Sequence, residues 1–281
     1  MSAISRSIMR VFSGLMALAL TCLPAAKETE APEQWAVLPG EIALRSAATT
    51  DSAVIATATQ DSKLTQAGEG DVKWVHVEYQ GNKGYVPEAL VLRVVKPETD
   101  EAGNLPVGKE VVDRDTPLPL DYKPSDLVAI DKQWDYHTGG VKHLRKEPAE
   151  AMERMFQAAR GDKVHLRVVS SFRSAMQQRY LYLRKIKKSG IAQQLVAKPG
   201  HSEHQLGTTI DVSGLNPETV LKADFAETRE GKWLRKNAEK FGFRFTYTEA
   251  TQAKTGFKPE PWHIRYMGKP KEEPQSALPS R

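Results

Sequence analysis

A stretch rich in proline and acidic residues, residues 96–126, divides the 281-residue chain into two parts with different hydrophobic patterns. Before it, apolar and polar residues alternate in short runs bounded by turn residues, which is typical of β-strands. After it, helical and strand-like patterns follow one another, which is typical of a mixed domain. Because the stretch itself has no sustained periodicity, we expect it to be a linker between two domains.

The first part, residues 35–95, is predicted to be a small all-β domain. Residues 74–79 alternate with period two, and the sequence QGNK that follows suits a hairpin turn. The pattern resembles the bacterial SH3 family, which implies a barrel that docks on cell-wall peptides or on the catalytic domain of its own chain. A barrel that acts only as a spacer is the alternative. The matching stretches are Leu44-Arg45, residues 74–77 and residues 84–86.

The first residues have the pattern of an export signal. Arg6 and Arg10 precede an apolar run of about ten residues, which is too short to cross the hydrocarbon core of a bilayer. We therefore expect residues 1–26 to be a signal peptide and the protein to be exported to the periplasm or cell envelope. Cys22 stands where a bacterial lipoprotein carries its lipid. A lipoprotein signal that ends before Cys22, with a lipid anchor in the membrane, is thus the alternative to a cleaved signal.

The charge pattern argues against nucleic acid as a partner. The net charge is +5 and the pI about 9.1, but basic and acidic residues are interspersed and no aromatic-basic motif accompanies them. An exported basic protein is better matched to an anionic cell envelope. We expect a monomer that contacts the membrane only if Cys22 is lipidated.

The second part, residues 127–268, is predicted to be an α+β domain with a small antiparallel sheet and flanking helices. Residues 147–161 begin with a proline suited to a first helical turn and place Met152, Met155 and Phe156 on one face, as an amphipathic helix does. The final residues, 269–281, have the composition of a disordered tail. Further predicted helices are residues 174–190 and 231–242, and the predicted strands are residues 163–171, 208–214 and 261–268.

Residues 199–214, PGHSEHQLGTTIDVSG, concentrate polar side chains around a turn and a strand. Asp211 lies within the strand pattern, where aspartate is disfavoured unless something requires it. A reversal of the chain at Gly207 would bring His204 back over Asp211. The two residues could be ligands of a zinc ion, or they could simply hydrogen-bond to each other, and this stretch alone leaves both open.

A third ligand and a base are available in residues 256–268, GFKPEPWHIRYMG, where His263 stands near Glu260. Pro261 between them excludes a helix interior. A catalytic zinc takes three protein ligands, keeps a fourth position open and needs a nearby carboxylate that is not a ligand. His263 and Glu260 complete that set with His204 and Asp211.

Three motifs, in this order and spacing, resemble the zinc D-alanyl-D-alanine carboxypeptidases of the VanY type. SSFRS stands where SGYRS is usual, SEHQLGTTID fits S-x-H-x-x-G-x-x-x-D, and EPWH fits E-x-W-H. The resemblance covers roughly residues 126–268. It implies a zinc metallopeptidase with one Zn²⁺ per chain.

The resemblance also implies a role for individual residues of the motifs. By it, Arg173 polarises the scissile carbonyl, and Ser202 and Gln178 contact the substrate. Ser171 and Phe172 replace the usual glycine and tyrosine, which leaves the substrate preference open. The metal ligands and the catalytic base that it implies are His204, Asp211 and His263 for the zinc and Glu260 for the base.

These features predict hydrolysis of the stem peptides of peptidoglycan by an attacking water. No Ser-x-x-Lys or Gly-x-Ser-x-Gly motif indicates an acyl-enzyme. The main prediction is a D,D-carboxypeptidase that releases a terminal D-alanine. The alternatives are an L,D-carboxypeptidase or stem-peptide endopeptidase, and a non-catalytic cell-wall-binding protein, which the complete set of site residues disfavours. The expected partners are stem peptides and, through the SH3-like domain, the cell wall.

Overall fold

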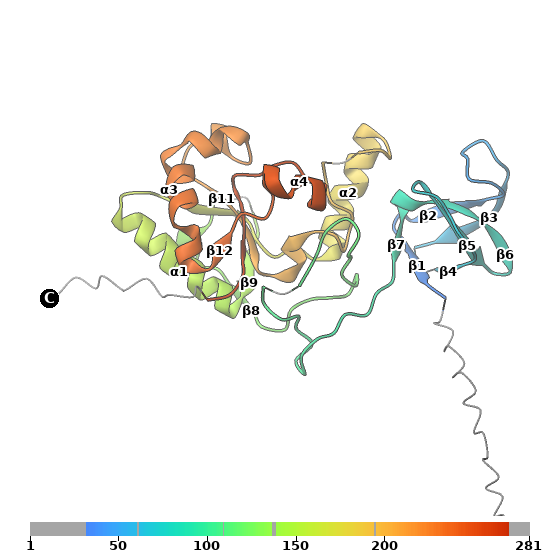
Figure 1. The fold of residues 1–281 in the computed structure, drawn as a ribbon, viewed down its shortest axis with the longest axis horizontal. Coiled ribbons are helices and arrows are strands. Elements are labelled where there is room, and N and C mark those ends of the chain that lie inside the picture. The colour runs from blue at the N-terminus through green and yellow to red at the C-terminus, as the bar shows by residue number, and fades with distance from the viewer. Residues whose placement is uncertain (1–31, 61, 109, 137–138, 194, 270–281) are drawn as a thin grey trace, which may run out of the picture. The chain divides into compact units, whose positions relative to one another are not determined.

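The structure, a computed structural model, describes residues 32–269 except residues 61, 109, 137–138 and 194 (Figure 1). The predicted signal peptide, with Cys22, lies outside the described residues, as does the predicted tail from residue 270 onward. Among the described residues, no helix combines the length and the apolar character needed to cross a membrane. The α+β prediction is confirmed, since an all-β part precedes a part that mixes helices and strands.

The all-β part is a seven-stranded antiparallel sheet with the order β3-β2-β6-β5-β4-β1-β7. The predicted hairpin joins β5 to β6 through Gln80 and Gly81, whose positive φ values of 49° and 77° suit a two-residue turn. Apolar side chains from alternate positions, such as Val77 and Val86, form its core. The strands are β1 (Gln34–Val37), β2 (Glu41–Arg45), β3 (Val54–Thr59), β4 (Lys63–Gln66), β5 (Trp74–Tyr79), β6 (Asn82–Pro87) and β7 (Val91–Arg93).

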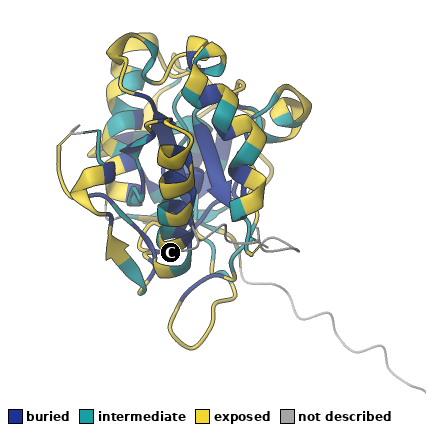
Figure 2. Cartoon of the chain, turned by 90° about the vertical axis from the view of Figure 1, so that its left-hand side faces the viewer, coloured by how far each residue is buried: buried dark blue, intermediate teal, exposed yellow. Residues whose placement is uncertain are grey.

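The second part is built on a four-stranded antiparallel sheet with the order β10-β11-β13-β12, beside a two-stranded sheet of β8 and β9. Met155 and Phe156 on the predicted face of α1 pack with Ile210 and Val212 of β11 in one core. Figure 2 shows strands of this part buried and helices with exposed outer faces. The strands are β8 (Leu127–Ala129), β9 (His143–Arg145), β10 (Arg167–Ser170), β11 (Thr209–Ser213), β12 (Phe243–Arg244) and β13 (His263–Tyr266), and the α-helices are α1 (Lys146–Gly161), α2 (Ala175–Ser189), α3 (Arg229–Asn237) and α4 (Glu249–Thr255).

Three elements are shorter than the pattern predicts. The strand expected over residues 163–171 begins only at Arg167, and Lys163 lies in the turn after α1 with a positive φ of 60°. The strand expected over residues 261–268 is β13, which spans His263–Tyr266. The helix expected over residues 231–242 begins at Arg229 but ends at Asn237, and a 3₁₀ turn, η6 (Ala238–Phe241), continues it. The short elements α4 and β12 have no counterpart among the predicted elements.

The segment predicted to be a linker has no helix or strand among its described residues, but it is packed rather than free. Arg145 of β9 donates from Nη1 to the carbonyl oxygen of Leu105 at 2.6 Å. Residues 96–126 therefore wrap the second part of the chain. The small cluster that anchors them consists of Leu105, Val112, Leu118, Tyr122 and Leu206.

The SH3-like part contacts α2 of the second part. Tyr182 of α2 is buried against Leu38 and Leu92, and its hydroxyl donates to the carbonyl oxygen of Ala89 at 3.0 Å. Lys198 forms an ion pair with a carboxylate of the SH3-like part, Glu88, at 2.5 Å. The resemblance implies two docking partners for the SH3-like part, and these contacts identify the second domain of its own chain as one of them.

Candidate metal centre

Two antiparallel strands position the polar face of the site. β11 and β13 pair so that Asp211 lies directly opposite His263, and residues that face each other in this way project from the same side of a sheet. The adjacent pair, Ile210 and Ile264, projects from the other side into the core. One face of the paired strands therefore carries the polar side chains of the site, and the other face packs in the hydrophobic core.

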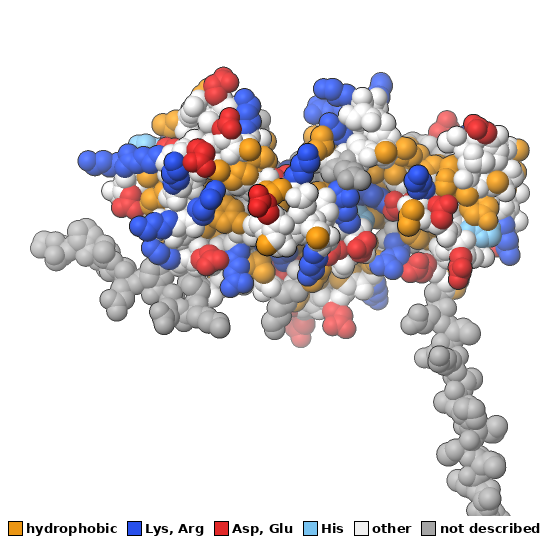
Figure 3. Space-filling model, turned by 45° about the horizontal axis from the view of Figure 1, so that its top comes forward, with side chains coloured by type: hydrophobic (Ala, Val, Ile, Leu, Met, Phe, Trp, Pro, Cys, Tyr) orange, Lys and Arg blue, Asp and Glu red, His pale blue; other side chains and the backbone are white. Residues whose placement is uncertain are grey.

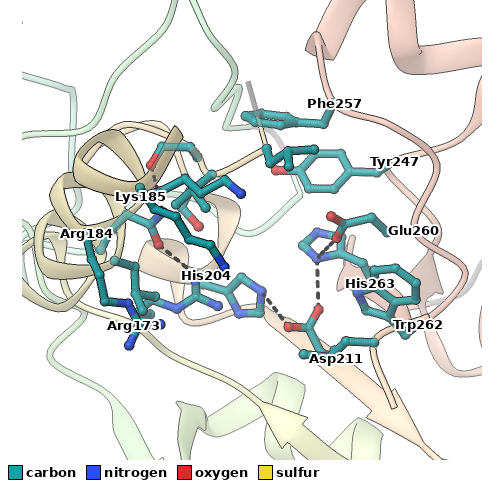
Figure 4. A pocket seen from close by; sticks show the side chains of 18 residues that line it. Arg173, Arg184, Lys185, His204, Asp211, Tyr247, Phe257, Glu260, Trp262 and His263 are labelled. Atoms are coloured by element: carbon teal, nitrogen blue, oxygen red, sulfur yellow. Dashed lines mark hydrogen bonds and ion pairs between the residues drawn. The ribbon is translucent and has the colours of Figure 1, made fainter. Parts of the chain in front are cut away.

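Gly207 brings a second histidine to this face. It follows the 3₁₀ turn η3 (Glu203–Leu206) with a left-handed φ of 70°, and a Cβ there would lie 3.0 Å from the side chain of Arg145. The chain then enters β11, so that His204 lies beside Asp211. His204, Asp211 and His263 each offer a ligand atom within 4.8 Å of the other two, and all three are buried (Figure 4).

Asp211 is the centre of this group. Its Oδ2 lies 3.3 Å from Nε2 of His204, and its Oδ1 lies 3.1 Å from Nδ1 of His263. Burial alone raises the pKa of the Asp211 carboxyl, but the two histidines outweigh this and hold the pKa well below its ordinary value. Asp211 is therefore an ionised oxygen donor shared by both rings.

Partners behind the rings determine which imidazole nitrogen faces Asp211. His204 Nδ1 donates to the carbonyl oxygen of Ser171 at 2.8 Å, and His263 Nε2 lies 2.9 Å from Oε2 of Glu203. Metal-ligating histidines are commonly fixed by such partners, which leave the other nitrogen for the metal. Two imidazole nitrogens and one carboxylate oxygen, with no fourth protein ligand among the described residues, fit a zinc ion that keeps an open position.

Glu203 belongs to a buried chain of charges that sequence reasoning missed. Its Oε1 accepts from Nη1 of Arg265 at 3.0 Å, and its Oε2 accepts from Thr246 at 2.5 Å. Nη2 of Arg265 in turn lies 3.2 Å from Oε1 of Glu110, in the segment 96–126. Burial raises the pKa of Glu203, but hydrogen bonding to His263 and the charge of Arg265 outweigh it and lower the pKa to about 2. Glu203 is thus an anion that holds His263.

Glu260 lies beside the metal-capable group without belonging to it. Its Oε2 is 3.7 Å from Nδ1 of His263, and its carboxylate lines the same cavity. Burial raises its pKa above the ordinary value, against an opposing effect of His263 and with a contribution from Asp211. A carboxyl group with a raised pKa, next to a metal site, is suited to accept and return a proton near neutral pH.

The structure places Arg173, Gln178 and Ser202 together in the wall of the cavity. Arg173 donates from Nη1 to Oε1 of Gln178 at 2.6 Å and from Nη2 to Ser170 at 3.1 Å. Gln178 donates from Nε2 to the carbonyl oxygen of Ala197 at 2.7 Å. Both polar atoms of the Gln178 amide are thus engaged within the protein, and Gln178 holds the guanidinium in position.

Tyr247 is a further site residue that the motifs did not reveal. Its ring stacks on His263 with 4.2 Å between centroids and 14° between planes, and it lines the cavity. Burial raises its pKa well above the ordinary value, so the phenol is neutral. The only signal in the sequence is its position in the aromatic run FGFRFTY, which by itself is more typical of a core strand.

The cavity that contains these residues has a volume of about 550 Å³, within the range of ligand-binding pockets. The metal-capable group and Glu260 lie in its wall (Figure 4). Two other surfaces of the lining are distinctive. They are a basic face on α2 (Arg184, Lys185 and Lys188) and an aromatic side (Tyr247, Phe257 and Trp262).

Comparison with known proteins agrees with both parts of this chain. A bacterial SH3 domain model matches residues 40–91, and the model of VanY, D-alanyl-D-alanine carboxypeptidase, matches residues 141–269. The chain is 37% identical over 162 residues to the putative carboxypeptidase YodJ of Bacillus subtilis, a match that covers 57% of this chain and 59% of YodJ. It therefore spans less than two thirds of the length of that relative.

Two further relatives are matched over most of their length. The bifunctional D-Ala-D-Ala dipeptidase and D-Ala-D-Ala carboxypeptidase VanXYC of Enterococcus gallinarum is 32% identical over 165 residues, which cover 57% of this chain and 84% of VanXYC. The solved structure of the LD-carboxypeptidase LdcB is 37% identical, with a TM-score of 0.53 over 56% of this chain and 75% of that one. With its metal-capable group in the matched region, this chain belongs to the VanY D-alanyl-D-alanine carboxypeptidase family and carries a bacterial SH3 domain before the family's domain.

Proposed function

We propose that this protein is a zinc-dependent peptidase that hydrolyses peptidoglycan stem peptides, most directly as a D,D-carboxypeptidase that releases a terminal D-alanine. The observation that carries the proposal is the buried group of His204, Asp211 and His263 with Glu260 beside it in the cavity wall. Membership of the VanY family and the D-Ala-D-Ala activities named for VanXYC support the choice of bond.

In this proposal, one zinc ion per chain is held by Nε2 of His204, a carboxylate oxygen of Asp211 and Nδ1 of His263. A bound Zn²⁺ supplies Lewis acidity at the open side of the site. The nitrogens named are those that face Asp211, while the others are fixed by Ser171 and Glu203. The ion needs His263 to give up any proton on Nδ1, because only an unprotonated imidazole nitrogen is a ligand.

Glu260 and Arg173 carry the chemical roles. Glu260 accepts a proton from the attacking water and returns it to the leaving amine, as its raised pKa allows. The guanidinium of Arg173, held in the cavity wall by Gln178 and Ser170, stabilises the negative charge that develops on the scissile carbonyl oxygen. Ser202 is proposed to contact the substrate, and Gln178 to position Arg173.

We further propose that the protein acts outside the cytoplasm and that its SH3-like domain also binds the cell wall. The export-signal pattern of residues 1–26 and the match to a bacterial SH3 domain support this. The alternative of a lipid anchor at Cys22 is tested by mass analysis of the mature N-terminus.

The decisive experiment is mass analysis of purified pentapeptide and tetrapeptide muropeptides after incubation with the protein. We expect loss of one alanine from the pentapeptide with the zinc-loaded protein and no loss after chelation. The Glu260→Gln variant is the control for a contaminating hydrolase. An unchanged pentapeptide under all conditions would overturn the D,D-carboxypeptidase proposal, and an unchanged tetrapeptide as well would overturn hydrolysis of stem peptides.

A second activity has specific support, since LdcB, an LD-carboxypeptidase, is 37% identical to this chain. The same experiment separates the two, because L,D-cleavage shortens the tetrapeptide and leaves the pentapeptide intact.

A further inference from the structure

One wall of the cavity carries positive charge that neither the metal group nor the chemistry at Glu260 uses. On α2, Gln178, Leu181, Lys185 and Lys188 all line the cavity. Their spacings of three, four and three residues place them in one stripe along the helix. Gln178, at one end of the stripe, contacts Arg173, and the two lysines continue the stripe away from it.

The opposite side of α2 is already occupied. Tyr182, Leu183 and Ile186 pack in the cluster shared with the SH3-like part. Lys198, on the loop after the helix, is paired with Glu88. The basic face of α2 is therefore oriented toward the cavity by the packing of the rest of the helix.

The basic face, defined as Arg184, Lys185 and Lys188, has no carboxylate partner within ion-pair distance among the described residues. Both acidic side chains that line the cavity, Asp211 and Glu260, lie at the metal-capable group. The charged side chains of the cavity wall beside α2 are therefore all basic. Figure 3 shows basic side chains gathered over α2 beside a hollow in the surface, and Figure 4 shows Arg184 and Lys185 across the cavity from Tyr247 and Phe257.

Distance along the helix indicates which part of a peptide would meet this face. At 1.5 Å per residue, Lys185 and Lys188 lie about 10 and 15 Å along α2 from Gln178. An extended peptide advances about 3.3 Å per residue. Groups at such distances correspond to residues about three to five positions away from the reacting bond, and a carboxypeptidase leaves only one residue on its leaving side.

We propose that the basic face of α2 is a subsite for a free carboxylate in the part of the substrate that precedes the cleaved bond. The inference rests on the proposed function and adds a substrate class to it. The class is stem pentapeptides whose second residue, three positions before the cleaved bond, keeps its carboxyl group unamidated. The lysines and Arg184 act through charge, so they strengthen binding and leave the chemical step unchanged.

The test uses two synthetic pentapeptides that end in D-Ala-D-Ala and differ at one group. One has a free α-carboxyl on its γ-linked D-glutamate at the second residue, and the other has the amide. We expect the wild-type protein to favour the free acid about 10-fold in kcat/KM, through KM. Three basic side chains, none of them buried, act together, and each such charge is weak alone. The preference should decline as salt is raised.

The variant Arg184→Gln/Lys185→Gln/Lys188→Gln should lose this preference and keep its kcat/KM on the amide within about twofold. Lys187→Gln is the matched control, because Lys187 lies on the same helix, is exposed and does not line the cavity. That control should retain the preference.

Equal losses of the triple variant on both peptides would overturn the inference and assign the basic face to the terminal carboxylate, which both substrates share. A wild-type protein that cleaves both peptides equally would also overturn it, while leaving the proposed function in place. Cleavage of neither peptide would overturn the proposed D,D-carboxypeptidase activity, and the inference with it.

Discussion

The seven-stranded sheet and the four-stranded sheet of this chain bury different kinds of side chain. Among the described residues 32–95, every buried side chain is apolar. In β11 of the second sheet all five residues are buried, yet Ile210 and Val212 alternate with Thr209, Asp211 and Ser213. The same period-two alternation thus separates core from solvent in one sheet and core from a buried polar site in the other.

Alternating side chains thus serve only stability in the seven-stranded sheet, whereas in the four-stranded sheet they also form the candidate site. Burying a polar group costs free energy unless a partner compensates it, and a buried charge costs more. The SH3-like sheet avoids that cost. The four-stranded sheet buries such groups at Asp211 and His263, where each charged or polar atom meets a partner of the opposite kind. Substitutions in the first sheet should therefore change stability, and substitutions in the second should change function.

Asp211→Ala is expected to have the largest effect, because it removes the donor shared by both histidines. The protein should lose its metal and, with it, several kcal/mol of stabilisation of the transition state, which amounts to roughly 10⁴-fold in rate. Metal content and hydrolysis of a stem pentapeptide measure this. Val77→Ala, in the SH3-like core, is the contrast: it should lower the free energy of unfolding by about 1 to 3 kcal/mol and keep metal and rate. Full activity of a metal-depleted wild-type sample would contradict the expectation.

Glu260→Gln should retain zinc and lose roughly 10² to 10⁴ in kcat, because the amide keeps the shape of the side chain but accepts no proton. The measurement is metal content and steady-state kinetics on the same preparation. Glu227→Gln, at an exposed position of the same domain, controls for the change of charge. If the Glu260→Gln protein comes without metal, Glu260 is a ligand and the base lies elsewhere.

Arg173→Ala should lower kcat by roughly 10² to 10³, as loss of other donors to a developing oxyanion does. Arg173→Lys should recover little, since an ammonium group does not reproduce the planar contacts to Gln178 and Ser170. Steady-state kinetics on a defined pentapeptide distinguish stabilisation of the oxyanion from binding of the ground-state substrate. A raised KM with unchanged kcat would make Arg173 an anchor for the ground-state substrate.

Glu203→Gln should weaken zinc binding, with a smaller effect than the substitutions above. The variant tests whether the buried carboxylate of Glu203, which is not a proposed ligand, supports the metal site. Partners behind metal ligands typically contribute 10- to 100-fold to metal affinity, so the Kd for zinc should rise by about that factor. Thr246→Val, which removes only the hydroxyl bonded to Glu203, should weaken zinc binding less. A zinc Kd unchanged in both variants would reduce Glu203 to a packing role.

Much of the fold could be predicted because local patterns and tertiary packing agree. The apolar stripe of α1, the alternation in β5 and the two-residue turn at Gln80 and Gly81 each indicate the observed element. The proposed metal ligands and the base followed from residue types in two of the three motifs. The register that pairs Asp211 with His263 then brings the motifs together.

The rest depends on contacts between residues far apart in the sequence. Glu203 stands next to His204, but its partner His263 is 60 residues away, and no spacing rule connects them. Arg265 is a further member of this buried chain of charges. It is buried with Glu203, and its position two residues after His263 on the same face of β13 was the available signal.

The segment 96–126 shows a different limit. Its proline and acidic residues predict a chain without helices or strands, as the described residues show. Its isolated apolar residues do not recur at a helical or strand spacing, so the sequence does not indicate which side of the segment is buried. Their partners, such as Leu206, lie in the second domain, so only the folded chain shows that the segment is packed.

The ion pair between Glu110 and Arg265 limits where the SH3-like domain can be exchanged for another domain in a chimera. Glu110 lies in the segment that joins the two domains, yet its charge reaches His263 through Arg265 and Glu203. A chimera that exchanges the SH3-like domain at a junction after Glu110 would discard one end of that chain, even though it keeps every proposed metal ligand. A junction before residue 96 would retain it. The unit that can be transplanted with its metal site is therefore longer than the family domain, and it includes the segment that a sequence pattern would treat as a spacer.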